Sequence, residues 1–593
     1  MIKTSDFLFK YLVEKHGITD VFLVTGGGAM HLNDSIGRNP DIRYICNHHE
    51  QASAIAAEGY YRASGKLCVT NVTTGPGGTN AVTGVLGQWT DSIPAIYISG
   101  QVKQSTTIHA CPDLHLRQLG DQEANIIDIV KPITKFAEMI TDANDIKYYI
   151  DKAIYLATHG RPGPVWIDVP LDVQAALIEE ENLKEFDPSE LEQQSYTPIE
   201  KSVKSVIEKL KTAKRPVFYV GNGLRLAGVV DDFIRIAEKT NIPVVTAISG
   251  HDIIWHDHPL FFGKPGICGD RIGNVMVQNS DLLIILGTRL GIRQIGYAYE
   301  QFAPSAYKIM VDIDACEMSK PTFTPDMKIH ADLNPFIKEM ESEVSTISFP
   351  DYTAWINWGN ERRKELPTVF EDNPSTPGYI SSYVFADELF KQLKSGDVVV
   401  TGNGTAYTST YQAMHVNKGV RVFANQGCAA MGYDLPAAIG AAAANKSGRT
   451  ILITGDGSIQ MNIQELQTLL TFNLPVKIFV LENEGSFFNK KYTGSNPQSG
   501  VICPDMAKIA GAYGIPFVRI HEEGKVLKDT IAEVLASPGV MICEITMDPE
   551  QTLFPKSASS MDKNGKMVSS PLERMFPFLP DEEQQKCTYP GSK

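Results

Sequence analysis

Short apolar runs that alternate with helical patterns constrain the fold of this chain more than any other feature. Four such runs occur in the first 180 residues, and an Ala-rich stretch at 51–63 has the composition of a helix; the runs are 21–24, 44–46, 67–72 and 95–99. Strands that alternate with helices form parallel sheets covered on both faces. The beginning of the chain is therefore predicted to be an α/β domain.

The same alternation of apolar runs and helical patterns occurs twice more along the chain. The second block has apolar runs at 216–220, 243–246, 281–287 and 308–312, and the third has runs at 397–401, 450–454 and 476–481. Polar, proline-bearing stretches at 179–198 and 350–377 separate the blocks and are predicted to be linkers, the second with a short helical patch. We predict three consecutive doubly wound parallel-sheet domains, at 1–180, 198–345 and 378–550. A tail at 551–593 is expected to wrap the surface or cover the active site.

Charge and cysteine content argue against several classes of protein. The 593 residues carry a formal net charge of −15 and no basic stripe, which disfavours binding to nucleic acids or anionic membranes. The nine cysteines are dispersed without a CxxC pair, as in a reduced cytosolic protein rather than a disulfide framework or zinc site. Because the sequence shows no signal peptide and no apolar run of about 18 uncharged residues, we expect a cytoplasmic protein.

The strongest local signal is Gly455-Asp456-Gly457-Ser458, which follows one apolar run, while Asn483 and Gly485 follow the next. The carboxyl ends of neighbouring parallel strands lie at one edge of a sheet, where α/β proteins bind ligands. Glycines let the backbone approach a diphosphate, and a helix N-terminus after Ser458 favours its negative charge. The Asp456 carboxylate, the Asn483 amide oxygen and the Gly485 carbonyl would leave three Mg²⁺ positions for phosphate and water.

Gly-Asp-Gly alone also occurs in ordinary turns, so the tripeptide by itself is a weak signal. Together with Asn483 at the second strand end, it matches the GDG…N signature of thiamine-diphosphate enzymes. Apolar residues recur after the motif at the spacing of one helical face, so a helix is predicted there; they are Ile459, Ile463, Leu466 and Leu470.

The chain resembles the acetohydroxyacid (acetolactate) synthase-like branch of these enzymes over essentially its whole length. Further matching stretches occur in the family's order; they are 49–51, 56–60, 74–80, 91–94, 99–102, 122–123, 131–135 and 431–438. The resemblance implies a pyrimidine-binding (PYR) domain, a central domain and a diphosphate-binding (PP) domain, with thiamine diphosphate and Mg²⁺ as cofactors. It also implies a homodimer or homotetramer, because relatives pair the PYR domain of one subunit with the PP domain of another.

The resemblance also assigns roles to individual residues. Glu50 would hydrogen-bond the aminopyrimidine ring and promote removal of a proton from the thiazolium carbon; its alternative is a charge that favours a helix N-terminus. Met431 would hold the two cofactor rings in a V shape, and the main-chain carbonyl of Ala429 would accept from the amino group. The other predicted cofactor-binding residues are Gly26, Gly75, Asn80, Gly402, Asn403, Gly404, Gly455, Gly457 and Ser458.

Several polar residues match positions near the substrate in relatives. Gln101, Gln122 and Lys135 line the substrate end there, and His49 beside Glu50 is a further catalytic candidate. Ordinary surface residues are the alternative for the first three, and His49 is equally compatible with a structural role.

The central domain departs from the family pattern. Acetohydroxyacid synthases hold FAD in this domain, and this chain keeps the family's Arg289 and Arg293 but loses the paired aspartates between them. Gly221-Asn222-Gly223 and the strand-end Asp312 and Asp314 are candidate nucleotide contacts. Three alternatives follow: the domain retains FAD, another nucleotide replaces it, or FAD is absent. We expect FAD to be absent.

Two stretches bear on the reaction. The tryptophan that usually selects the second ketoacid is missing near Thr493, which argues against branched-chain amino-acid synthesis. The stretches 25–28 and 571–579 resemble those of proteins associated with surface-sugar biosynthesis. We expect an enzyme that decarboxylates a 2-keto acid such as pyruvate and transfers the acyl unit to a carbonyl acceptor, by this resemblance a keto-sugar nucleotide. The alternatives are a decarboxylase or cyclic-diketone hydrolase, a flavin-linked oxidase, and a non-catalytic paralogue; Glu50, Asp456 and Asn483 disfavour the last.

Overall fold

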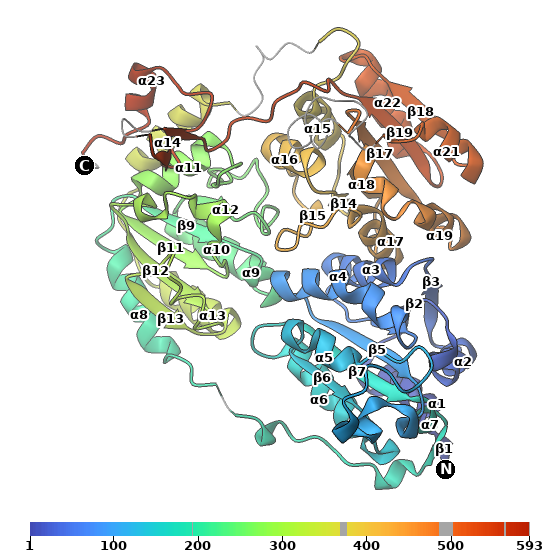
Figure 1. Cartoon of the computed structure of the whole chain (residues 1–593). Coiled ribbons are helices and arrows are strands. Elements are labelled where there is room, and N and C mark those ends of the chain that lie inside the picture. The colour runs from blue at the N-terminus through green and yellow to red at the C-terminus, as the bar shows by residue number, and fades with distance from the viewer. Residues whose placement is uncertain (193, 368–375, 486–501, 562–564, 592–593) are drawn as a thin grey trace.

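The computed structural model of the chain describes residues 1–192, 194–367, 376–485, 502–561 and 565–591. Three parallel sheets of five or six strands follow one another along the chain (Figure 1). The predicted fold class, three consecutive parallel-sheet α/β domains, is confirmed. No helix among the described residues is long and apolar enough to cross a membrane.

The first sheet, in the PYR domain, has the strand order β3-β2-β4-β5-β7-β6. Its strands are β2 (Asp20–Leu23), β3 (Arg43–Cys46), β4 (Val69–Val72), β5 (Ala95–Gln101), β6 (Phe136–Met139) and β7 (Pro164–Pro170). The helices of this part are α1 (Thr4–His16), α2 (Met30–Arg38), α3 (Glu50–Ser64), α4 (Pro76–Asp91), α5 (Ile126–Val130), α6 (Ile146–Thr158) and α7 (Leu171–Ala175), and β1 (Ile2–Lys3) pairs with β8 (Leu177–Ile178). Strands β2, β4, β5 and β7 are buried along their whole length, as expected for a parallel sheet covered on both faces.

The central sheet has five strands in the order β10-β9-β11-β12-β13. Its strands are β9 (Pro216–Val220), β10 (Val244–Thr246), β11 (Leu282–Leu286), β12 (Tyr307–Asp312) and β13 (Met327–His330). The helices of this part are α8 (Ile199–Leu210), α9 (Gly223–Leu226), α10 (Val230–Thr240), α11 (Arg271–Asn279), α12 (Ile292–Ile295), α13 (Leu333–Ser345) and α14 (Thr353–Glu365).

The last sheet, in the PP domain, has the order β15-β14-β16-β17-β19-β18. Numbered from its own first strand, it has the same order as the PYR sheet. Its strands are β14 (Val398–Thr401), β15 (Arg421–Phe423), β16 (Thr450–Gly455), β17 (Val476–Glu482), β18 (Phe517–Ile520) and β19 (Met541–Thr546). Its helices are α15 (Ser382–Phe390), α16 (Thr405–Ala413), α17 (Asp434–Ala444), α18 (Asp456–Gln460), α19 (Leu466–Thr471), α21 (Met506–Tyr513) and α22 (Lys525–Ala536).

Helices α3 and α17 cross at close range and join the PYR and PP domains (Figure 1). Glycines make this approach possible: a Cβ on Gly59 would overlap the Ala437 carbonyl oxygen, and a Cβ on Gly440 would overlap the Ala56 carbonyl oxygen. Apolar residues of both helices lie in one buried cluster. The two domains are therefore packed through a shared core within a single chain.

The structure departs from the sequence prediction in the second linker and describes the position of the tail. Helix α14 lies in the predicted linker 350–377, where a short helical patch was expected, and its Trp355 is buried in the core of the central domain, so this part of the stretch packs as a helix on that domain. The tail begins against the PP domain, where Gln412 of α16 donates to the Pro555 carbonyl. It continues onto the central domain, where Arg271 of α11 donates to the carbonyls of Met575 and Pro577. The tail also contains a β20–β21 pair (Ser559–Met561, Met567–Ser569) and α23 (Asp581–Lys586).

The single helix predicted after the Gly-Asp-Gly motif is broken into α18, a 3₁₀ turn (Ile463–Glu465) and α19. The break comes at Asn462, whose backbone leaves the helical region (φ −138°). Its side chain donates to the carbonyl oxygen of Gly432 (2.7 Å) and to Oε1 of Gln51 (2.9 Å). Long-range hydrogen bonds thus override a helical pattern that was correct in its apolar spacing.

Candidate cofactor site

Asp456 directly follows β16 and is buried, with 7% of its surface exposed. Its Oδ1 accepts from the main-chain N–H of Gly457 (2.7 Å), and its Oδ2 accepts from those of Gly485 (2.8 Å) and Asn483 (3.3 Å). Strands β16 and β17 are direct neighbours in the sheet. The structure therefore brings together the three predicted metal-ligating residues at one sheet edge. Burial raises the pKa of Asp456, and the three N–H donors oppose that rise.

The loop after β14 supplies the glycines predicted as a second phosphate-side loop. A Cβ on Gly402 would overlap the Asp434 carboxylate, so only glycine fits there. Gly404 adopts a left-handed conformation with φ 71° before α16 begins. Asn403 Nδ2 donates to the carbonyl oxygen of Ala430 (2.8 Å), which ties this loop to the segment before α17.

The segment before α17 lies against the Gly-Asp-Gly turn. Ala429 has a left-handed backbone (φ 54°), and the Gly432 N–H donates to Ser458 Oγ (3.0 Å). Among the described residues, a Cβ placed on Gly457 would lie 3.5 Å from Met431 Cε and would meet no other atom within 4 Å, and one placed on Gly455 would meet none. Met431 therefore adjoins the turn, and no described side chain crowds its glycines.

Glu50 is the first residue of α3 and is buried, with 8% of its surface exposed. Asn80 Nδ2 donates to Glu50 Oε2 (2.9 Å). Gly75 has φ 65°, and a Cβ there would overlap the main-chain carbonyl of Gln122, which itself has φ 60°. Gly26 packs in the same way against the side chain of Thr73. The residues predicted for the pyrimidine side thus line adjoining loops at one edge of the PYR sheet.

Gln101 is buried, with 3% of its surface exposed, and its amide is saturated by protein partners. Oε1 accepts from Thr74 Oγ1 (2.6 Å) and the Val102 N–H (3.0 Å), while Nε2 donates to the Ala124 carbonyl and to Asp168 Oδ2 (3.0 Å each). In this structure Gln101 supports the loops around it. Its contact with substrate stays a prediction.

His49 and Lys135 also have protein partners. Nδ1 of His49 accepts from the Gln51 N–H (3.1 Å), so His49 caps α3. Lys135 Nζ donates to the His159 carbonyl oxygen (2.6 Å), and burial lowers the pKa of Lys135 to about 8. The catalytic role of His49 and the substrate-end role of Lys135 stay predictions. The predicted departure near Thr493 lies outside the described residues.

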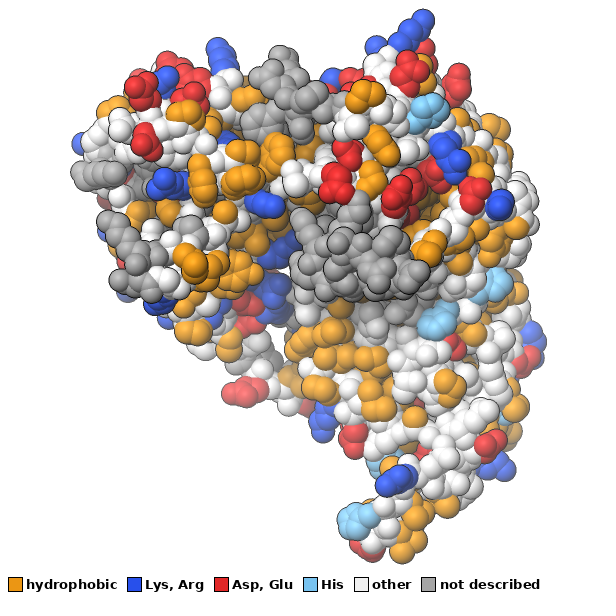
Figure 2. All heavy atoms as spheres, turned by 45° about the horizontal axis from the view of Figure 1, so that its top comes forward, with side chains coloured by type: hydrophobic (Ala, Val, Ile, Leu, Met, Phe, Trp, Pro, Cys, Tyr) orange, Lys and Arg blue, Asp and Glu red, His pale blue; other side chains and the backbone are white. Residues whose placement is uncertain are grey.

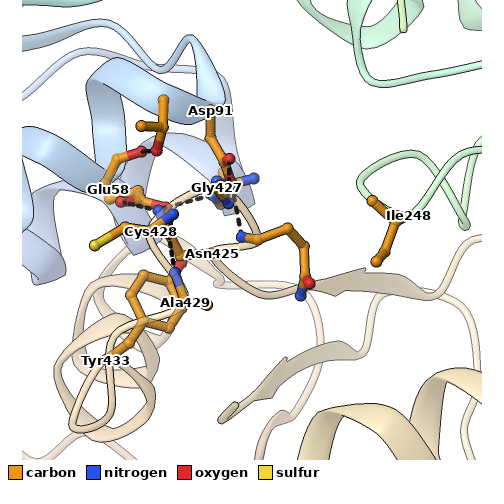
Figure 3. Close-up of polar contacts among 12 residues, drawn as sticks. Glu58, Asp91, Ile248, Asn425, Gly427, Cys428, Ala429 and Tyr433 are labelled. Carbon is orange, nitrogen blue, oxygen red and sulfur yellow. Dashed lines mark hydrogen bonds and ion pairs between the residues drawn. The ribbon is translucent and has the colours of Figure 1, made fainter. Parts of the chain in front are cut away.

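A buried polar network between the PYR and PP domains had no predicted role (Figure 3). The Glu58 carboxylate accepts from Arg62 (2.7 Å), from Asn425 (3.1 Å) and from the Tyr433 hydroxyl (3.1 Å). Asp91 accepts from Arg62 and from the main-chain N–H groups of residues 426 and 427. Glu58 and Asp91 both stand in stretches that matched the family, so the signal was present, but the pairing depends on the three-dimensional fold.

A cavity of about 650 Å³ opens where the central domain meets the other two. Arg289, Arg293, Asn222 and Asp312, which are among the candidate nucleotide contacts, line it, whereas Asp314 pairs with Arg161 (2.8 Å). The Asn222 Oδ1 atom is buried without a hydrogen-bond partner among the described residues. Burial raises the pKa of Asp312 to about 6. A cavity of this size and polarity fits a small organic ligand.

The arrangement in the PP domain fits a diphosphate and a divalent metal ion. Glycines that no described side chain crowds, a helix start at Asp456 and one buried carboxylate would provide a cradle for phosphate oxygens and a hard cation. The described residues contain no group of three or more His, Cys, Asp or Glu side chains that could hold a metal ion. A metal at Asp456 would therefore be completed by amide, carbonyl and phosphate oxygens.

Comparisons with known proteins agree with this geometry. Family models of the thiamine pyrophosphate enzymes match in chain order: the N-terminal TPP-binding domain at 2–124, the central domain at 203–340 and the C-terminal TPP-binding domain at 402–545. The chain is 32% identical to chloroplastic acetolactate synthase of Arabidopsis thaliana over 93% of its length and 82% of that protein. It is 31% identical to the acetolactate synthase large subunit of Cyanidium caldarium, covering 94% of this chain and 95% of the relative. The chain belongs to the thiamine pyrophosphate enzyme family, in the acetolactate synthase-like branch that its motifs resemble.

Proposed function

We propose that the protein uses thiamine diphosphate and Mg²⁺ to decarboxylate a 2-keto acid such as pyruvate and to transfer the acyl unit to a carbonyl acceptor. The observation that carries the proposal is the buried carboxylate of Asp456, which contacts the main chain at both Asn483 and Gly485. The likeness to acetolactate synthases along nearly the whole chain supports the choice of pyruvate as donor.

The residues of this chain would act in two groups. Asp456, Asn483 and Gly485 would hold Mg²⁺ and through it the diphosphate, while Met431 would support the cofactor rings. Glu50 would hold a proton at the pyrimidine ring, and Asn80 keeps its carboxylate in place. When bound, thiamine diphosphate supplies the carbon nucleophile that attacks the keto carbon. The protein supplies position and charge.

The acceptor that we propose is a keto-sugar nucleotide, based on the resemblance of residues 25–28 and 571–579 to proteins of surface-sugar biosynthesis. Product analysis tests this against the alternatives. The protein is incubated with pyruvate alone, with pyruvate and a simple aldehyde or ketone, and with pyruvate and a keto-sugar nucleotide. An acylated sugar nucleotide is expected; acetolactate as the sole product would overturn the acceptor, and acetaldehyde alone would indicate a decarboxylase.

We also propose a homodimer or homotetramer in the cytoplasm. Large apolar side chains are exposed on the PYR domain, including Leu86, Trp89, Leu114, Leu119 and Ile129. Hydrophobic side chains also gather on the face of the molecule in Figure 2. Clustered exposed apolar residues often mark a protein interface. All nine cysteines are unpaired, which suits a reducing compartment.

A further inference from the structure

A second cavity, of about 400 Å³, lies where all three domains meet. Three arginines line it, one from each domain: Arg62 of α3, Arg225 of α9 and Arg421 of β15. Tyr61 lines it from the PYR domain, and Asn222 is shared with the larger cavity of the central domain. The described residues that line this second cavity include no aspartate or glutamate.

The acidic partners of these arginines lie behind the cavity wall. Arg62 pairs with Glu58 and Asp91, as described above. Asp252, whose side chain is 1% exposed, accepts from both Arg225 (3.0 Å) and Arg421 (2.6 Å). The carboxylates thus hold the arginines in place, and none of the three carboxylates belongs to a residue that lines the cavity.

One donor of these arginines is left unused by the protein. The Arg225 Nε atom is buried and has no hydrogen-bond partner among the described residues. An unpaired buried donor is costly, and a ligand that accepts from it removes that cost. Burial, together with the neighbouring charge of Arg225, lowers the pKa of Arg421 to about 10, so an anion in the cavity would stabilise its charged form.

We propose that this three-arginine cavity binds a phosphate group, either inorganic phosphate or the phosphate of a larger molecule. Guanidinium groups from different directions match the geometry of a tetrahedral oxyanion, and charge-assisted bonds to it are strong. Because each domain contributes one arginine, the bound phosphate stabilises the arrangement of the three domains relative to one another.

The test titrates inorganic phosphate into the protein saturated with thiamine diphosphate and Mg²⁺, by calorimetry and by thermal unfolding at constant ionic strength. One phosphate per chain and a saturable rise in Tm are expected. Arg225→Gln should weaken binding at least about tenfold, and so should Arg225→Lys to a smaller extent. Arg235→Gln is the matched control, because Arg235 is an exposed arginine of the same domain, and its variant should bind normally.

Tyr61→Phe keeps every ion pair, so it tests the cavity even where the arginine variants have a folding defect. It should weaken phosphate binding several-fold. A parallel titration with a nucleoside monophosphate separates the two sources: equal affinity indicates free phosphate, and much tighter binding indicates a larger phosphorylated ligand. The proposal is overturned if neither probe gives a saturable response, or if Arg225→Gln and Tyr61→Phe both bind phosphate as the unmodified protein does.

Discussion

Asp456 illustrates how one side chain prepares a metal site. Its carboxylate already accepts from three main-chain N–H groups, which fixes its position between the strand ends of β16 and β17. Such a carboxylate can bind a cation without a rearrangement of the sheet that carries it. The desolvation that raises its pKa would be offset by the charge of a bound cation.

Asp456→Ala should remove most of the affinity for thiamine diphosphate and Mg²⁺, because the metal loses its only anionic side-chain ligand. Calorimetry with Mg²⁺ present measures the loss. Asp529→Ala, which removes an exposed carboxylate of the same domain, is the control and should bind normally. Unchanged cofactor binding in Asp456→Ala would remove the metal assignment.

Glu50→Gln should lower turnover by about 10²–10⁴-fold while cofactor binding stays largely intact. Glutamine keeps the size of the side chain but lacks the negative charge that stabilises a protonated pyrimidine ring. Hydrogen exchange at the thiazolium carbon, followed by NMR, should slow in step with turnover. Glu138→Gln, at an exposed position of the same domain, should change neither hydrogen exchange nor turnover. Normal exchange and turnover in the Glu50 variant would exclude Glu50 as the activating group.

Residues that stand in short local motifs could be predicted from the sequence, as at Gly75 and Asp456. Gly75 lies against a carbonyl group, and Asp456 is a single carboxylate at the end of a strand. The Glu58–Asn425 contact joins residues 367 positions apart, and nothing local specifies it. The same holds for Gln101, whose saturated amide is visible only once its four partners are in place.

At the scale of elements, each predicted apolar run lies within about two residues of a strand, because buried parallel strands need nearly continuous apolar sequence. Six described strands of the three sheets had no predicted run: β6, β7, β13, β15, β18 and β19. Helix α14 was expected only as a short helical patch within a linker because its sequence is strongly charged, although its Trp355 is buried. The helix after Gly-Asp-Gly was interrupted by the side chain of Asn462. In both cases a tertiary contact outweighed the local pattern.

Lys264 links the central domain to the PP domain and should make stability depend on pH. It is buried, and its Nζ donates to the carbonyls of Gln412 (3.3 Å) and Met414 (3.2 Å). Burial lowers its pKa from 10.5 to about 8, and Asp270 opposes this. Between these two values the unfolded chain binds more protons than the folded chain, so stability should rise as pH increases from about 8 to 10.5.

Lys264→Met should remove this contribution, which is on the order of 3 kcal/mol across the window. The measurement is the difference in Tm between the unmodified protein and the variant at several pH values. That difference should shift in favour of the unmodified protein as pH rises. Lys338→Met, at an exposed position of α13, is the control. A difference that does not vary with pH would contradict the assignment.

At the scale of the molecule, activity should require at least a dimer. By the family resemblance, one cofactor would lie between the PYR domain of one subunit and the PP domain of its partner, and exposed apolar residues on the PYR domain here suit such an interface. Light scattering should find a dimer or tetramer, and dilution below the dissociation constant should abolish activity. A fully active monomer would refute this expectation.

Purified protein should lack stoichiometric flavin, because the sequence between Arg289 and Arg293 departs from the family pattern. The large cavity of the central domain would then take another ligand or none. Absorbance at about 450 nm, where flavins absorb, measures the flavin content. A full flavin band would show the expectation to be wrong, and reduction by pyruvate would then separate a redox role from a structural one.

The PYR and PP sheets share one strand order, and their functional loops correspond strand by strand. Gly26 follows the first strand of one sheet and Gly402 the first strand of the other; Gly75 and Asp456 follow the two third strands, and Asn483 follows a fourth. Two sheets with one strand order are what duplication of a single domain would produce. With the cofactor bound as proposed, one such edge would hold its aromatic ring and the other its charged tail.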